Sequence, residues 1–475
     1  MASFKEVMKG FPRIFWVSNI MELFERWAWY GFYMAFALYL TLSKDSGALG
    51  FTQAQKGAIM GTGTMLLYFL PLITGAIADR VGYKIVLILS FICYVAGYYM
   101  VGNFESYEAI FFSYIFLAFA GALFKPIISA MIAKTTNEES SSIGFGIFYM
   151  MINIGGFIGP FLSGLMYNTS WDLVFYMSMI TIGINFVLVF LFFREPGREK
   201  SLDTFLVNIW KAIKNIFITL TDFKYVLFLV IMAGFWTAFN QLYYSFPIFL
   251  DDWVDLDRLS VSLGFDPGRI TAVTMSSLNA FFIILFQLWI STIAMRYRPL
   301  HAMITGIFIL GFGLFLMFIS QNAWLAIFGI LVFAIGEMAS SPKFTEYIGR
   351  IAPSDKKALY MGTSFLPIAA GHWLAGWISG DIYANIAEKI TLLQKEVSAR
   401  GLTLPEISES FTRSDYYSKA SEMMGLNENE ITDFLFTQHH PNKIWIIFSS
   451  IALGAGLTLF LYDRFILKGR SASSK

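Results

Sequence analysis

The sequence predicts an all-α membrane protein with the major facilitator fold, in which about twelve transmembrane helices form two six-helix bundles. Three observations indicate this class. Of the 475 residues, 56% are hydrophobic and only 14% are charged, whereas soluble domains carry about 25% charged residues. About twelve apolar runs approach the roughly 20 residues that a spanning helix needs. A charged linker near the middle of the chain divides these runs into two sets of six.

The predicted spans follow one another with mostly short connections. They begin near Ile14, Gly57, Ile85, Tyr107, Ile143, Asp172, Tyr225, Ile270, Leu300, Trp324, Lys357 and Lys443. The linker after the sixth span combines lysines with apolar residues at helical spacing, which favours an amphipathic helix on the membrane surface. An ordinary solvated linker is the alternative.

Basic residues gather in the loops on one side of the predicted membrane, and the opposite loops are short or acidic. This asymmetry predicts that both termini are cytoplasmic. The predicted regions are an N-terminal bundle at 1–193, a cytoplasmic amphipathic linker at 194–223, and a C-terminal bundle at 224–380 and 443–467. Residues 381–442 are polar and lie between spans eleven and twelve, so we expect them to form an extracytoplasmic cap.

Ionisable side chains occur inside several predicted spans, where each costs roughly 2.5–3.5 kcal/mol at mid-bilayer and is therefore a functional candidate. Span one carries Glu22, Glu25 and Arg26 at the spacing of one helix face. Span four carries Lys125, and span ten carries Glu337. These charges predict a water-accessible cavity between the halves, suited to a substrate with a carboxylate at one end and an ammonium at the other. Alternatively, the charges pair with one another and only hold the helices together.

A carboxylate beside a cation in a partly dry cavity can also carry a proton, because burial and the neighbouring charge act on it in opposite directions. Glu22 and Glu25 are therefore the candidates for coupling to protons. The four histidines have no partners at metal-ligand spacing, so neither a metal nor another cofactor is expected. No phosphate-binding or nucleophile motif is present, which argues against an enzyme. A net charge of +1 gives no reason to expect nucleic-acid binding.

Residues 75–84 close span two with the sequence GAIADRVGYK. Its glycines permit close helix packing. Asp79 and Arg80 can contact a neighbouring helix and separate from it when the halves move. The segment resembles the loop motif GxxxDRxGxK of the major facilitator superfamily, which implies a gating role for these two residues.

A narrower resemblance rests on six motifs in the same order along the chain. The segment ELFERWAWYG at 22–31 is similar to the ExxERFxYYG motif of the proton-coupled oligopeptide transporter (POT) family. Further similar motifs are FKP at 124–126, FYMMINIG at 148–155, FWTAFNQ at 235–241, GE at 336–337 with SP at 341–342, and GHWLAG at 371–376. The resemblance covers nearly the whole chain except the cap.

The resemblance implies a secondary active transporter in a cytoplasmic or plasma membrane, moving di- and tripeptides with protons by alternating access. It implies that Arg26 and Lys125 hold the peptide carboxylate, and that Glu337 holds the amino terminus. The remaining implied roles are amino-terminus binding by Asn153 and Asn279, cavity lining by Tyr30 and Tyr68, and a side-chain pocket shaped by Trp236. The expected partners are a small peptide or similar zwitterion or anion, protons and the lipid bilayer.

Two departures keep other functions open. Tyr33 and Asn240 stand where the family has an arginine and a glutamate that form an extracellular salt bridge, so closure on that side must be held in another way. One alternative is a relative that carries another small organic anion or zwitterion, without proton coupling. Another is a transporter-like receptor or assembly subunit that binds partners through the cap.

Overall fold

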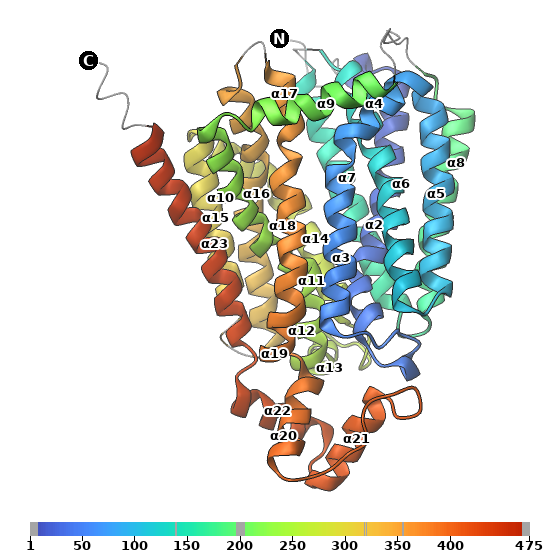
Figure 1. Cartoon of the computed structure of the whole chain (residues 1–475), viewed down its shortest axis with the longest axis vertical. Helices are drawn as coiled ribbons and strands as arrows, with labels where there is room; N and C mark the ends of the chain where they lie inside the picture. The colour runs from blue at the N-terminus through green and yellow to red at the C-terminus, as the bar shows by residue number, and fades with distance from the viewer. Residues whose placement is uncertain are drawn as a thin grey trace.

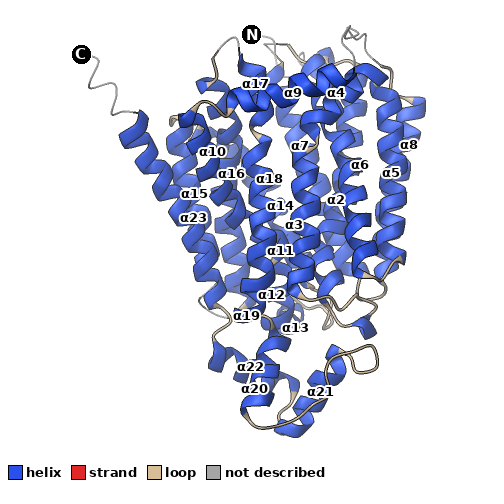
Figure 2. Ribbon diagram, viewed as in Figure 1, coloured by secondary structure: helices blue, strands red, loops and turns tan. Residues whose placement is uncertain are grey.

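The computed structural model describes residues 8–137, 140–195, 205–317, 319, 321–353 and 356–467. Within these ranges the chain forms helices and loops, with no β-strand (Figure 2). This is the expected result for a chain that crosses a membrane, because a helix satisfies its backbone hydrogen bonds within one segment.

The first group of helices contains the predicted spans one to six. Its members are α2 (Arg13–Thr41), α3 (Gln53–Phe69), α4 (Pro71–Val81), α5 (Tyr83–Asn103), α6 (Tyr107–Lys134), α7 (Ser141–Met166) and α8 (Trp171–Leu191). α3 and α4 form one span that bends by 47°. Pro71 explains the bend, because proline fits the first position of a helix but not its interior.

The second group contains spans seven to twelve. Its members are α10 (Phe223–Phe239), α11 (Gln241–Tyr244), α12 (Phe246–Trp253), α14 (Ala272–Ala294), α15 (Pro299–Leu316), α16 (Ala323–Ile351), α17 (Lys357–Thr363), α18 (Phe365–Trp377), the π-helical turn η3 (Ile378–Ile382), α19 (Tyr383–Ile386), α23 (Lys443–Leu461) and the π-helical turn η4 (Tyr462–Leu467). The two groups meet where α3 packs against α18 and where α7 packs against α14.

Nine described helices are long and apolar enough to cross a membrane, and α3 with α4 makes a tenth. Two further spans are less obvious by composition. α2 carries three ionisable residues in its middle, and span eleven is divided among α17, α18 and η3. With these two, the described residues account for the predicted twelve.

α2 begins and η4 ends at the same end of the bundle, which we name the terminal face, and the opposite end is the cap face (Figure 1). α9 (Phe205–Thr219) lies across the terminal face and contacts α4 and α17 (Figure 1). It falls within the predicted linker, of which residues 196–204 lie outside the described ranges. Trp210 and Phe217 on this helix are exposed.

The cap contains three helices, α20 (Lys389–Ala399), α21 (Arg413–Met424) and α22 (Glu428–His439), with α13 (Leu256–Ser262) on the same face of the bundle. Thr412 and Asn427 each form a capping box at the start of α21 and α22. Seven apolar side chains of the cap are buried, and they are continuous with the apolar cluster of the spans: Leu392, Leu393, Val397, Tyr416, Ala420, Ile431 and Leu435. The polar insertion is therefore a folded unit and not a loose loop.

Candidate substrate-binding site

A cavity of about 190 Å³ lies between the two groups of helices. It is lined by Trp29, Tyr30, Tyr33, Thr64, Tyr68, Tyr149, Trp236, Phe239, Asn240, Tyr243, Glu337, Ser341, Ile368 and His372. α2, α3 and α7 supply one side, while α10, α11, α16 and α18 supply the other. Any molecule in this cavity therefore contacts both groups.

A buried ion-pair cluster lies on α2 beside the cavity. Arg26 Nη2 donates to Glu25 Oε1 at 2.6 Å, and Arg26 Nε lies 3.4 Å from Glu22 Oε1. The hydroxyl of Tyr94 also donates to Glu25. The three charged side chains are less than a tenth exposed. The predicted sharing of one helix face is therefore present, and two carboxylates compete for one guanidinium.

Lys125 contributes a second positive charge from α6. Its Nζ lies 4.3 Å from the centre of the Tyr68 ring, a distance typical of a cation–π contact. Among the described residues, no carboxylate lies within ion-pair distance of Lys125. Unlike Arg26, this lysine therefore has no ion-pair partner in the described part of the chain.

Glu337 supplies the opposite charge from α16. Its Oε2 accepts a hydrogen bond from Asn279 Nδ2 at 2.9 Å. No cation among the described residues forms an ion pair with Glu337, whereas Lys343 on the same helix pairs with Glu346 at 2.7 Å. The cavity region thus holds an unpaired positive group from the first half of the chain and an unpaired negative group from the second.

The predicted substrate residues fall into two layers. Tyr30, Tyr68, Trp236 and Glu337 line the cavity directly. The others do not line the cavity but contact residues that do. Arg26 is 5.6 Å from the Tyr30 ring, Lys125 contacts Tyr68, Asn279 bonds to Glu337, and Asn153 Nδ2 donates to the carbonyl oxygen of Tyr149 at 2.8 Å.

Sequence reasoning gave no role to His372, which lines the cavity and stacks on Tyr68 with 5.0 Å between ring centres. Its Nδ1 lies 3.3 Å from the hydroxyl of Tyr244. A single histidine in an apolar run was the available signal. Tyr149 and Tyr243 were also missed, because an aromatic residue in a span has the same pattern whether it packs against lipid, protein or ligand.

Several polar atoms around the cavity are buried and have no hydrogen-bond partner among the residues that the structure describes. They are Asn240 Nδ2, Trp236 Nε1, Ser341 Oγ and Asn279 Oδ1. A buried polar group without a partner costs about 1–3 kcal/mol. A ligand with amide and carbonyl groups can satisfy such atoms, so the walls are suited to a polar guest.

The two predicted gating residues lie on the terminal face and are exposed. Asp79 accepts a hydrogen bond from the hydroxyl of Tyr83 at 2.7 Å, and Lys134 donates to the same hydroxyl at 2.9 Å. These contacts join α4, α5 and α6 within the first group. Gating by Asp79 and Arg80 stays a prediction.

With this fold and cavity, the class of protein can be stated. The model of the Major Facilitator Superfamily matches residues 20–375, and the chain belongs to this superfamily. It is therefore a multi-pass membrane transporter, and the superfamily consists of transporters and not enzymes.

The predicted resemblance to the POT family within the superfamily is confirmed. A peptide transporter of Yersinia enterocolitica is 25% identical over 79% of this chain and 88% of its own length. The structure of a POT peptide transporter in complex with sulfate has a TM-score of 0.72 at 17% identity, covering 98% of this chain and 96% of that one. A POT family transporter in complex with 5-aminolevulinic acid also gives 0.72 at 17% identity, covering 97% and 99%. The bacterial relatives of this chain, together with its membrane-spanning helices, assign the chain to a plasma membrane.

Proposed function

We propose that this protein is a secondary active transporter that imports di- and tripeptides together with protons. The observation that carries the proposal is the pair of unpaired opposite charges beside a cavity that both groups of helices line: Glu337 in its wall, and Lys125 in contact with Tyr68 of the wall. A zwitterion satisfies both charges at once and draws the two groups together. The peptide transporters among the relatives support the same substrate class.

The contacts around the cavity support a proposed role for each end of the peptide. The carboxylate binds near Lys125 and Arg26, and the ammonium binds Glu337, which Asn279 holds in place. The carbonyl groups between them accept hydrogen bonds from Asn240 Nδ2 and Trp236 Nε1, two buried donors at the cavity that lack a partner among the described residues. Aromatic walls contact the side chains with little hydrogen-bonding specificity, which suits a transporter of many different peptides. Tyr30, Tyr68 and Asn153 complete the proposed site.

Proton coupling is proposed for the cluster of Glu22, Glu25 and Arg26. While both carboxylates are ionised, they hold the guanidinium between them. A proton on one carboxylate removes one ion pair and frees guanidinium N–H groups for the carboxylate of the substrate. Proton binding and peptide binding then favour each other, as symport requires. Rocking of the two halves, with Asp79 and Arg80 acting on the terminal face, completes the proposed cycle.

The test is uptake of labelled dialanine into proteoliposomes, with and without an inward proton gradient. The variants Lys125→Gln and Glu337→Gln each remove one of the two opposite charges with little change in side-chain volume. We expect gradient-driven uptake by the parent protein and at least about a tenfold loss in either variant, because a charged hydrogen bond contributes about 1.5–3 kcal/mol. The matched controls Lys395→Gln and Glu105→Gln change exposed residues far from the cavity and should transport normally.

Three results would contradict parts of the proposal. Uptake that ignores the gradient removes the coupling role of Glu22 and Glu25 but keeps the peptide substrate. Uptake that persists in both Lys125→Gln and Glu337→Gln contradicts the proposed binding site. No uptake by folded parent protein contradicts the peptide substrate and favours another substrate.

The second candidate is transport of another small zwitterion. The charges of Lys125 and Glu337 suit any molecule with a carboxylate and an ammonium a few bonds apart. One solved POT family transporter is in complex with such a molecule, 5-aminolevulinic acid. A thermal-shift screen of amino acids and small zwitterions separates the two candidates, because a ligand that binds the folded state raises its melting temperature.

A further inference from the structure

A buried lysine joins the two groups of helices near the cap face. Lys56, in the first turn of α3, is 0% exposed. Its Nζ donates to the carbonyl oxygens of Tyr244 and Ser379, both at 2.9 Å, and to Gln53 Oε1 at 2.8 Å. An ammonium group has three donors, so all of them are used. Two of the three bonds cross from the first group of helices to the second.

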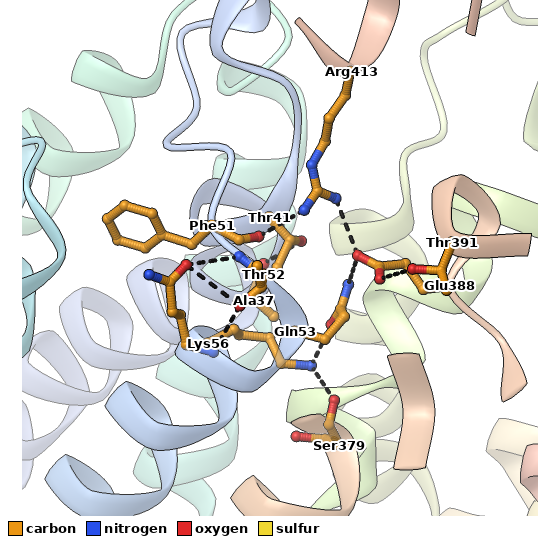
Figure 3. A network of polar contacts seen from close by, with 11 residues as sticks. Ala37, Thr41, Phe51, Thr52, Gln53, Lys56, Ser379, Glu388, Thr391 and Arg413 are labelled. Atoms are coloured by element: carbon orange, nitrogen blue, oxygen red, sulfur yellow. Dashed lines mark hydrogen bonds and ion pairs between the residues drawn. The ribbon is translucent and has the colours of Figure 1, made fainter. Parts of the chain in front are cut away.

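The network continues outward into the cap (Figure 3). Gln53 Nε2 donates to Glu388 Oε1 at 3.3 Å, and Arg413 Nη1 donates to the same oxygen at 3.1 Å. Arg413 Nη2 donates to the carbonyl oxygen of Phe51 at 3.0 Å, while Thr391 donates to Glu388 Oε2 at 2.6 Å. The cap belongs in sequence to the second group, yet Arg413 holds the loop that begins α3 of the first. We name Gln53, Lys56, Glu388 and Arg413 the cap-face lock.

The helix backbones beside the lock are in direct contact. A Cβ atom added to Gly57 would lie 2.2 Å from the carbonyl oxygen of Gly376, and one added to Gly376 would lie 2.4 Å from that of Gly57. Such separations leave no room for a solute between α3 and α18. The cap face is therefore closed at this contact, and the lock lies across it.

The chemistry of the lock gives it two stable arrangements. While the groups are in contact, Lys56 and Glu388 are buried and fully hydrogen-bonded. If the groups separate, Lys56 loses its bonds to Tyr244 and Ser379, and Glu388 loses its bond to Gln53. A buried charge that loses partners is strongly unfavourable. Water that enters the open face can replace the lost partners. Intermediate separations, with neither partners nor water, are disfavoured.

We propose that the cap-face lock is the gate that closes the extracytoplasmic side of this transporter, with the cap as its outer half. The proposal rests on the alternating access of the proposed function. It assigns Lys56 as the residue that joins the two groups and Arg413 as the residue through which the cap stabilises closure. Each transport cycle then requires the lock to break and re-form.

The test measures access to Met60, which is buried one turn along α3 from Lys56 and whose carbonyl accepts a hydrogen bond from Tyr244 of the other group at 3.0 Å. Met60→Cys is introduced with Cys93→Ala, and the purified full-length protein in lipid nanodiscs is treated with a charged methanethiosulfonate reagent. Lys56→Met keeps the length of the side chain but removes its charge and all three hydrogen bonds. Lys395→Met is the matched control, because Lys395 bonds only to Asn385 on its own side.

We expect Lys56→Met to raise the labelling rate about tenfold or more, since each charged hydrogen bond contributes on the order of a tenfold change in equilibrium, and Lys395→Met to leave it unchanged. Arg413→Gln, in the partly exposed outer half, should raise the rate about threefold. Its control is Arg400→Gln, because Arg400, the residue that follows α20, pairs with Glu396 of that helix. If Lys56→Met does not fold, the pair Arg413→Gln and Arg400→Gln decides.

Unchanged labelling in folded Lys56→Met and Arg413→Gln overturns the lock. The labelling assay needs no substrate, so its outcome is separate from dialanine uptake. Faster labelling of Lys56→Met and Arg413→Gln, with no peptide transport by the parent protein, supports the lock and contradicts the peptide substrate. Normal labelling in variants of a protein that does transport dialanine removes the lock and keeps the function.

Discussion

The cavity and the cap-face lock lie at the same interface between the two groups of helices, but they treat polar atoms in opposite ways. In the lock, the three donors of Lys56 and both oxygens of Glu388 have protein partners. Around the cavity, the side chains of Asn240, Trp236 and Ser341 each have a buried polar atom without one. Polar atoms that have hydrogen-bond partners within the protein hold the two groups together. Buried polar atoms that lack such partners are suited to bind a ligand.

The largest expected effect concerns the charged cluster that borders the cavity. Arg26→Ala leaves Glu22 and Glu25 buried without a cation, which should lower the free energy of unfolding by about 3–5 kcal/mol. The melting temperature in detergent measures this loss. Arg258→Ala, at an exposed position of α13, should change stability by less than about 0.5 kcal/mol. Equal stability of the two variants would mean that the cluster is solvated.

A smaller effect is expected where the backbones meet beside the lock. Gly57→Ala places a methyl group against the carbonyl of Gly376, and overpacking of this kind costs about 1–3 kcal/mol. Gly454→Ala in α23 is the control, because nothing lies within 4 Å of its added Cβ. It should be neutral or stabilise by up to about 1 kcal/mol, since alanine favours helices over glycine. The opposite signs of the two changes in melting temperature test the closed contact, and the same sign would contradict it.

A pair of amide substitutions, one in each region, separates the two regions most directly. Gln53 and Asn240 are both buried amides, each 1% exposed. Gln53→Leu removes partners from Lys56 and Glu388 and should cost about 1–3 kcal/mol. Asn240→Leu removes a nitrogen that has no partner, so its melting temperature should stay close to that of the parent. In return, Asn240→Leu should weaken dialanine binding, while Gln53→Leu should leave it largely intact. Lower stability of Asn240→Leu together with weaker dialanine binding by Gln53→Leu would contradict the roles given to the cavity and the lock.

Much of the fold could be predicted because the membrane imposes it. The apolar runs begin within a few residues of the observed helices, as at Tyr107 and Lys443, where the predicted and observed starts coincide. The cluster of Glu22, Glu25 and Arg26 was also predictable, because local helix geometry alone brings such residues together. The bend between α3 and α4 at Pro71 was not predicted, although proline is its local cause.

The sequence by itself determined the number of spans, the charges inside them and the resemblance to peptide transporters, because these depend on composition and local spacing. Only the tertiary structure decided that Arg26 is already paired while Lys125 and Glu337 are not, and that His372 faces the cavity. It alone revealed the lock. Lys56 is 188 residues from Tyr244 and 323 residues from Ser379, and its acceptors there are backbone carbonyls. Every residue has such a carbonyl, so no pattern in the sequence marks the two that meet this lysine.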